Sequence, residues 1–103
     1  MKRKDESVFR VFDVREFQEF EENKYFYGNN FDKNSGFIHL SLKKQIKGTI
    51  ETHFPKQRVI ITEFNIRDLE TLLKWEKSRD SIEFPHFFGV LEFRWVRSIT
   101  ENY

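Results

Sequence analysis

Two of the three histidines in this chain lie where they could carry chemistry, and the first of them is His39. It stands between two aliphatic residues and precedes Ser41 by two positions. Because side chains alternate along an extended chain, His39 and Ser41 would share one face if a strand ran through both. The pair is therefore a candidate site. The alternative is a buried imidazole bonded to the backbone, with Ser41 as a plain helix cap.

The second candidate, His86, lies in the sequence Phe-Pro-His-Phe-Phe-Gly at residues 84–89. Pro85 fixes its own φ and Gly89 permits an unusual φ, so a rigid aromatic turn is predicted here. Binding sites often hold a titratable side chain on such a loop. The alternative is a turn that closes the core and leaves His86 in water.

The third candidate is Glu76, which directly follows Trp75. A carboxylate beside an indole can be partly desolvated, which strengthens its interaction with a positive centre. Arg79 could pair with Glu76 or contact a phosphate through two hydrogen bonds. The alternative is an exposed Glu76 after a core Trp75, with Arg79 in a solvated loop.

Other chemistry finds little support. The absence of cysteine excludes thiol catalysis and disulfides. There is no glycine-rich dinucleotide motif, no Walker loop and no His-Glu-x-x-His, and Ser41 lacks the flanking glycines of a nucleophile elbow. His53 is one residue off the apolar spacing of its helix, which predicts a rim position. A zinc site is chemically feasible but has generic spacing, so no metal is expected; it would use His39, His53, His86 and Glu76.

The hydropathy pattern predicts an α+β fold to position these residues. A helix is expected from Asp13 to about Glu22, because Asp13 and Glu16 form an Asp-x-x-Glu start signal. A second is expected from Ser41 to about Phe54, where apolar residues recur every four positions, with Ser41 as its N-cap. Strands are predicted at residues 7–12, 37–40, 58–64, 74–76 and 93–99, a short helical turn at 68–73, and a polar loop at 29–36. Few connections contain a helix, so a mainly antiparallel sheet is expected.

Length and charge set the broad class. The 103 residues predict one domain over residues 1–103, with a core at about 8–99. Thirteen Phe, three Tyr and two Trp must fill that core, since Ala is absent. The 18 basic and 17 acidic residues nearly cancel, which disfavours nucleic acid as a partner. No stretch is typical of a membrane span or signal peptide, so a cytoplasmic protein is expected.

Three segments in one order resemble a known family: residues 35–41 (SGFIHLS), 73–76 (LKWE) and 84–91 (FPHFFGVL), with His53-Phe54 between them. The pattern is similar to the family called domain of unknown function 952, from about Val8 to Ile99. That family has no settled activity, and this sequence gives no reason to adopt the glutathione S-transferase-like label of some members. Its fold is similar to that of ADP-ribosyltransferases, which implies a compact, split, mainly antiparallel β core with two main flanking helices.

The resemblance also implies roles for individual residues. In the wider superfamily a first-strand His-x-Ser/Thr grips the nicotinamide-side ribose of NAD, and the matching positions are His39 and Ser41. A late acidic residue often stabilises the oxocarbenium-like ribose during glycosidic cleavage, for which Glu76 is the candidate. His86 would be an addition of this family. The resemblance thus suggests NAD as substrate and assigns no cofactor.

Two departures from the family pattern bear on catalysis more than on binding. The family usually has Tyr before the final Gly of the Phe-Pro-His block, where this chain has Phe88, so a hydroxyl contact is lost. A central aromatic motif of the kind that stacks nicotinamide in active transferases is also missing.

Three hypotheses follow. The first is an enzyme of ADP-ribosyl transfer or N-glycosidic cleavage. Its catalytic residues would be Glu76, His39 and His86, and its ligand-binding residues His39, Ser41, Trp75, Arg79 and His86. The second is a non-catalytic module that binds ADP-ribose or a small anionic metabolite in the same pocket. The third is a protein-interaction domain whose surface uses exposed aromatics among Tyr25, Phe26, Tyr27 and Phe31. The sequence leaves open whether the protein is an enzyme.

Overall fold

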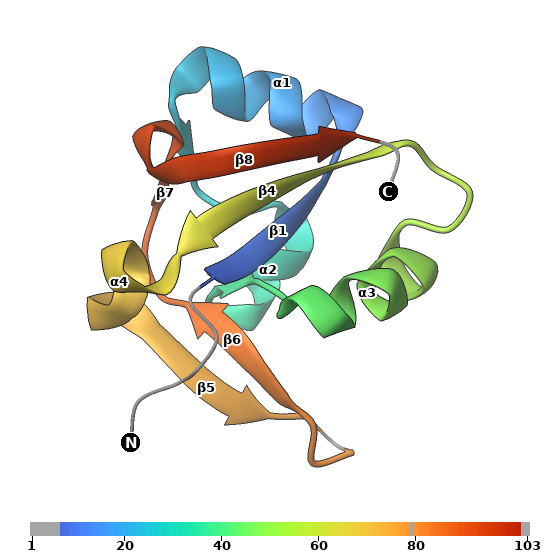
Figure 1. The fold of residues 1–103 in the computed structure, drawn as a ribbon, viewed down its shortest axis with the longest axis vertical. Coiled ribbons are helices and arrows are strands. Elements are labelled where there is room, and N and C mark those ends of the chain that lie inside the picture. Colours follow the sequence, from blue (N-terminus) through green and yellow to red (C-terminus); the bar gives the residue numbers. More distant parts are fainter. Residues whose placement is uncertain (1–6, 79, 102–103) are drawn as a thin grey trace.

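Small antiparallel sheets form the framework of the computed structural model, which describes residues 7–78 and 80–101 (Figure 1). The first sheet places β4 (Val59–Asn65) between β1 (Ser7–Asp13) and β8 (Val96–Glu101). The second pairs β2 (Tyr25–Phe26) with β7 (Leu91–Glu92). The third places β6 (Glu83–Phe87) between β3 (Ile38–His39) and β5 (Leu73–Lys77). The predicted α+β fold with antiparallel strands is confirmed.

The helices flank these sheets. They are α1 (Val14–Asn23), α2 (Asn30–Ser35), α3 (Ile46–His53) and α4 (Ile66–Leu69), with 3-10 turns at Lys43–Gln45, Glu70–Leu72 and Phe93–Trp95. Figure 1 shows α1 at the top of the view, above β8, and α3 to the right of β1. The radius of gyration of 12.8 Å is that of a compact chain of this length. None of the described helices is long and apolar enough to span a membrane.

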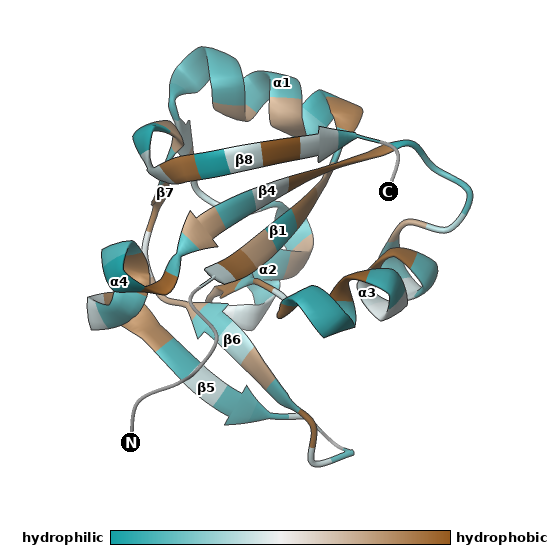
Figure 2. Ribbon diagram, viewed as in Figure 1, coloured by the Kyte–Doolittle hydropathy of each residue, from teal (hydrophilic) through white to brown (hydrophobic). Residues whose placement is uncertain are grey.

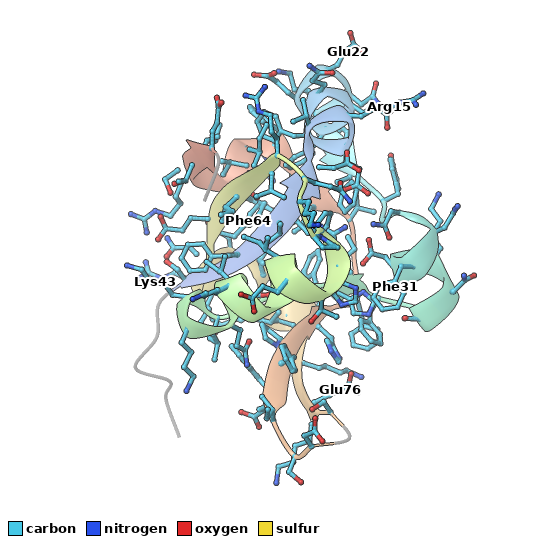
Figure 3. The ribbon with its side chains drawn as sticks, turned by 90° about the vertical axis from the view of Figure 1, so that its right-hand side faces the viewer. Arg15, Glu22, Phe31, Lys43, Phe64 and Glu76 are labelled. Atoms are coloured by element: carbon cyan, nitrogen blue, oxygen red, sulfur yellow. The ribbon has the colours of Figure 1, made fainter. Side chains whose placement is uncertain are left out.

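Helix α1 begins as predicted. The Asp13 carboxylate accepts from the backbone N–H of Glu16, and the Glu16 side chain accepts from the backbone N–H of Asp13, which is a complete capping box. The two phenylalanines one turn apart, Phe17 and Phe20, are buried. The opposite face is polar in Figure 2, and Figure 3 shows Arg15 and Glu22 pointing outward from the helix.

Aromatic rings dominate the core, as the composition predicts. Phe12 is fully buried and lies 5.3 Å from Phe20 in a stacked arrangement and 5.0 Å from Phe26 edge-on. Such ring pairs add roughly 0.5–1.5 kcal/mol each beyond the apolar area that they bury. The core therefore holds β1, α1 and β2 together. A second cluster, formed by Val11, Val59 and Ile61 with Ile46, packs the other face of β1 and β4 against α3.

A short extended segment joins the first and third sheets. The backbone N–H groups of Phe9 and Ser41 each donate to the other residue's carbonyl at 2.8 Å. The Leu40 N–H donates to the carbonyl of Pro85 at 3.2 Å. The chain after β3 thus crosses from β6 to the edge of β1. This crossing brings His39 of the third sheet close to the residues of β1.

The prediction of a polar loop at residues 29–36 is wrong, because a six-residue helix, α2, forms there. Asn29 caps it by accepting from the N–H of Asp32, whose carboxylate accepts in return from the N–H of Asn29. Gly36 ends the helix with a left-handed φ of 89°. The Asn and Gly that were read as loop signals are therefore helix caps.

The predicted helix from Ser41 starts later than expected, and Ser41 is not its N-cap. Its backbone is used in the bridge to Phe9, and its hydroxyl hydrogen-bonds Thr49 at 2.8 Å. The chain then makes a 3-10 turn before α3, with the Gln45 side chain accepting from the backbone N–H of Leu42. Because the backbone of Ser41 pairs with that of Phe9, α3 begins several residues later than predicted.

The Phe-Pro-His segment is also not a turn, because residues 83–87 form β6. Pro85 has no N–H to donate, but its carbonyl accepts from Leu40, so the strand keeps its place in the sheet. Gly89 is not at positive φ. A Cβ there would lie 2.7 Å from the Leu72 side chain, so close packing is what requires glycine. The last strand begins at Val96 rather than Phe93, since a 3-10 turn precedes it.

Candidate functional site

A buried carboxylate, Asp32, organises one side of the candidate site. Its Oδ1 accepts from His39 Nδ1 at 2.7 Å, from the His39 backbone N–H at 3.0 Å and from Arg10 Nη1 at 2.9 Å. Its Oδ2 accepts from the backbone N–H of Asn29. Burial alone would raise the pKa of Asp32, but the hydrogen bond from His39 and the charge of Arg10 hold it well below its usual value.

Because Asp32 is ionised and can only accept, His39 must carry its proton on Nδ1. Its Nε2 has no hydrogen-bond partner within the described part of the chain. Arg10 closes the arrangement by donating from Nη1 to the carbonyl of His39 at 3.0 Å as well. The imidazole is therefore fixed at its backbone and at one ring nitrogen, and it presents the other nitrogen for further contacts.

Strand register brings the second histidine to the first. β3 pairs with β6 so that His39 stands opposite His86, and β5 continues the same row with Lys74. Residues directly opposite in an antiparallel pair are side-chain neighbours on one face. The centroids of the two imidazole rings are 5.8 Å apart.

Glu76 stands two residues beyond Lys74 on β5, diagonal to His86 on the same face. Its Oε1 accepts from His86 Nδ1 at 2.6 Å. This second carboxylate–histidine pair again leaves Nε2 of the ring without a partner among the described residues. The structure thus brings His39, His86 and Glu76 into one cluster.

Phenylalanine rings fix the planes of both imidazoles. Phe31 of α2 stacks on His39 at 4.2 Å with an interplanar angle of 12°. Phe37 stacks on His86 at 3.9 Å and 18°. In Figure 3, Phe31 lies beside α3, and Glu76 lies below it on the β5–β6 hairpin.

A hollow of about 450 Å³ opens between the edge of β1, α3 and the β5–β6 hairpin. All three histidines line it. Its other lining residues include Arg10, Asp13 and Glu16 from the β1–α1 segment, Ser41 and Thr49, and the rings of Phe31, Phe54 and Phe84. Imidazoles and a guanidinium thus share one concave surface with two carboxylates and several aromatic rings.

The sequence profile of the family described as protein of unknown function (DUF952) matches residues 11–99. The chain belongs to this family. No curated protein matches it. The solved structures similar to this DUF952 chain include protein CC0527 from Caulobacter crescentus. Its crystal structure is 27% identical, with a TM-score of 0.86 over 92% of this chain and 84% of that chain. Its solution NMR structure, also 27% identical, gives 0.80 over 91% and 82%.

The other predicted site residues of this DUF952 protein differ in where they lie relative to the hollow. Ser41 lines the hollow, and its hydroxyl is engaged with Thr49. Trp75 lies on the opposite face of β5 from Glu76, where it packs against the hydrophobic core. Glu76 is exposed rather than desolvated, and it reaches the site through His86. Arg79 lies outside the described residues.

Two residues that sequence reasoning missed hold the site together. Arg10 is buried in the middle of β1, and its signal was a charged residue flanked by apolar neighbours on both sides. Asp32 is buried at the start of α2, and its signal was the Asn29-x-x-Asp32 spacing of a helix start. Their pairing joins segments 22 residues apart, which no local pattern shows.

His53 is exposed but lies at the rim of the hollow as expected, with its ring 5.1 Å from that of Phe31. Its pKa is lowered from the usual value, first by partial burial and then by the positive charges of His39 and Arg10, with Asp32 opposing. Across residues 7–78 and 80–101, no three histidine or acidic side chains are grouped to hold a metal ion.

Proposed function

We propose that the protein binds a nucleotide-type ligand, of the NAD or ADP-ribose class, in the hollow beside β1. The observation that carries the proposal is the pair His39 and His86. Each is oriented by a carboxylate on Nδ1, and both line the same hollow. The volume is in the range of small-molecule sites, roughly 300–1,000 Å³. The rings of Phe31 and Phe84 offer apolar surface for a flat base or nicotinamide.

Acid–base chemistry is the activity that two such histidines support best. A neutral imidazole can take a proton through Nε2 while a protonated one donates, and each such role contributes about 10²–10⁴-fold to a rate. In cleavage at the N-glycosidic bond of NAD, one imidazole takes the proton of the attacking water or acceptor hydroxyl. The electron pair of the C–N bond leaves with the nicotinamide ring.

The carboxylates divide into two kinds in this proposal. Glu76 does not line the hollow, so it acts through His86 as a positioning residue. Glu16 does line it, and its Oε2 is held by the Asn29 side chain at 2.9 Å. Glu16 is therefore the carboxylate that would meet positive charge developing on the ribose. This assignment shifts the role that the family resemblance suggested for Glu76.

The test is an amide and histidine-ring NMR titration with NAD, ADP-ribose and nicotinamide, with product analysis of the same samples. The proposal expects saturable shifts centred on His39 and His86, and their loss in His39→Ala and His86→Ala. Gln18→Ala on the exposed face of α1 is the control and should behave as wild type. If none of the three ligands shifts a residue of the hollow, the proposal fails.

One observation favours a binding module as a second candidate. Both carboxylates that line the hollow, Asp13 and Glu16, are engaged in the capping box of α1. A module of this kind would bind ADP-ribose as tightly as NAD and release no nicotinamide over long incubation. Nicotinamide released by wild type and not by His39→Ala or His86→Ala would select the enzyme.

A further inference from the structure

Three side chains that carry or can carry positive charge line the hollow: Arg10, His39 and His53. Arg10 is only 4% exposed, yet it lines the hollow. Its Nη1 is shared between Asp32 and the His39 carbonyl. Its Nε has no hydrogen-bond partner among the residues that the structure describes. A buried guanidinium with an unused donor is a charge that its own surroundings satisfy incompletely.

The carboxylate beside it is also shared. Asp32 is the acceptor for both Arg10 and His39, so one negative charge faces two cations whenever His39 is protonated. His53 adds a third group that can carry positive charge at the rim. The acidic residues of the hollow, Asp13 and Glu16, belong to the start of α1 and bond each other's backbone N–H groups.

We propose that these three side chains form an anion subsite that takes the phosphate or diphosphate of the ligand. His39 Nε2 and the His53 ring would contact the anion, with Arg10 supplying charge from behind. This inference rests on the proposed function and adds which part of the ligand lies where. The phosphates lie toward α3 and His53, and the rest of the ligand extends toward His86.

The electrostatics at His53 support this orientation. Apart from partial burial, the positive charges of His39 and Arg10 lower the pKa of His53 against the smaller effect of Asp32. The charged groups that act on the His53 ring therefore disfavour its protonated form. A bound phosphate would add negative charge beside the ring, so binding should raise the pKa of His53.

The experiment compares ligands that differ in phosphate content. Inorganic pyrophosphate, ADP-ribose and adenosine are titrated separately into wild type, His53→Gln and the control Thr52→Ala, an exposed neighbour on the same helix that does not line the hollow. Losing one charge-assisted contact should weaken ADP-ribose and pyrophosphate by about five- to tenfold in His53→Gln. Adenosine binding and the Thr52→Ala control should not change. Pyrophosphate should also raise the His53 pKa followed by ring resonances.

The outcomes separate this inference from the proposed function. If ADP-ribose and adenosine bind in the hollow with equal affinity and pyrophosphate shifts neither His39 nor His53, the anion subsite is overturned and the nucleotide pocket stands. If pyrophosphate binds at His39 and His53 while ADP-ribose and NAD do not bind, the nucleotide proposal is overturned and the anion subsite stands. Unchanged pyrophosphate affinity in His53→Gln overturns the role given to His53.

Discussion

The two carboxylate–histidine pairs differ in their surroundings far more than in their geometry. The distances from Nδ1 to the carboxylate oxygen are 2.7 Å for His39–Asp32 and 2.6 Å for His86–Glu76. The Asp32 side chain is 1% exposed, whereas that of Glu76 is 46% exposed. Asp32 also accepts from Arg10 and two backbone N–H groups, whereas Glu76 bonds only His86 among the residues that the structure describes.

The His39–Asp32 pair therefore contributes to the stability of the fold, whereas the His86–Glu76 pair contributes only to the candidate site. Removing a buried charge's partner leaves another charge without compensation, whereas an exposed carboxylate exchanges its bond for water. His39 is therefore held by the same interactions that anchor α2 to β1. His86 is held by a stacked Phe37 and by a carboxylate that the fold does not need.

The largest effect should come from Asp32→Asn. The amide cannot accept from Arg10, His39 and the backbone of Asn29 together, and it leaves the Arg10 charge buried and unpaired. Breaking a buried pair in this way costs about 3–5 kcal/mol of the free energy of unfolding. Urea denaturation measures it, with Glu76→Gln as the matched acid-to-amide control, for which we expect a change of at most about 1 kcal/mol. Equal losses of unfolding free energy in the two variants would contradict the distinction between a pair that stabilises the fold and one that does not.

The next effect is on acid stability. The pKa of Asp32 is lower in the folded chain than its unfolded value of about 3.9. Its contribution is therefore fully present above about pH 4 and is lost as the pH falls below it, with a slope of up to about 1.4 kcal/mol per pH unit. Asp32→Asn should lack this part of the slope, and Glu76→Gln should retain it. Urea midpoints from pH 2.5 to pH 6 provide the measurement.

A smaller effect is expected at Ser41, beside the buried pair. Its hydroxyl is 2.8 Å from that of Thr49. This bond connects α3 to the bridge segment, residues 40–41, which joins the first and third sheets. Ser41→Ala should lower the free energy of unfolding by about 0.5–1.5 kcal/mol, the usual worth of one hydrogen bond. Thr49→Ser keeps the hydroxyl and should lose less of that bond's contribution. A loss as large as that of Asp32→Asn would show that the bridge segment, rather than Asp32, holds this region.

Elements with local signals were predictable from the sequence. The start of α1 follows from Asp13 and Glu16, whose two hydrogen bonds need only four consecutive residues. The strands β1 and β4 follow from apolar runs. Helix α2 was missed although its caps were visible. The six residues between Asn29 and Gly36 include one apolar residue, Phe31, and therefore carry no apolar periodicity.

The site was predictable only in its residue types. His39, His86 and Glu76 could be named as candidates, but their convergence depends on the register that sets His39 opposite His86, which sequence spacing does not contain. Pro85 suggested a turn because proline has no N–H to donate in a sheet. Its carbonyl accepts from the N–H of Leu40, but this partner lies 45 residues earlier and no local pattern shows it. Arg10 and Asp32 were missed for the same reason, since neither has a role until the other is beside it.

The smallest effect on stability, and the sharpest test of the comparison, is Glu76→Ala. The Glu76 side chain is about half exposed and, among the described residues, bonds only His86, so the free energy of unfolding should change by less than about 1 kcal/mol. The His86 ring should nevertheless lose its single tautomer, because nothing then holds the proton on Nδ1. Nitrogen-15 shifts of the imidazoles at pH 8 report this directly, with His39 in the same spectrum as the internal control. A His86 tautomer unchanged in Glu76→Ala would mean that stacking on Phe37, and not the carboxylate, orients the ring.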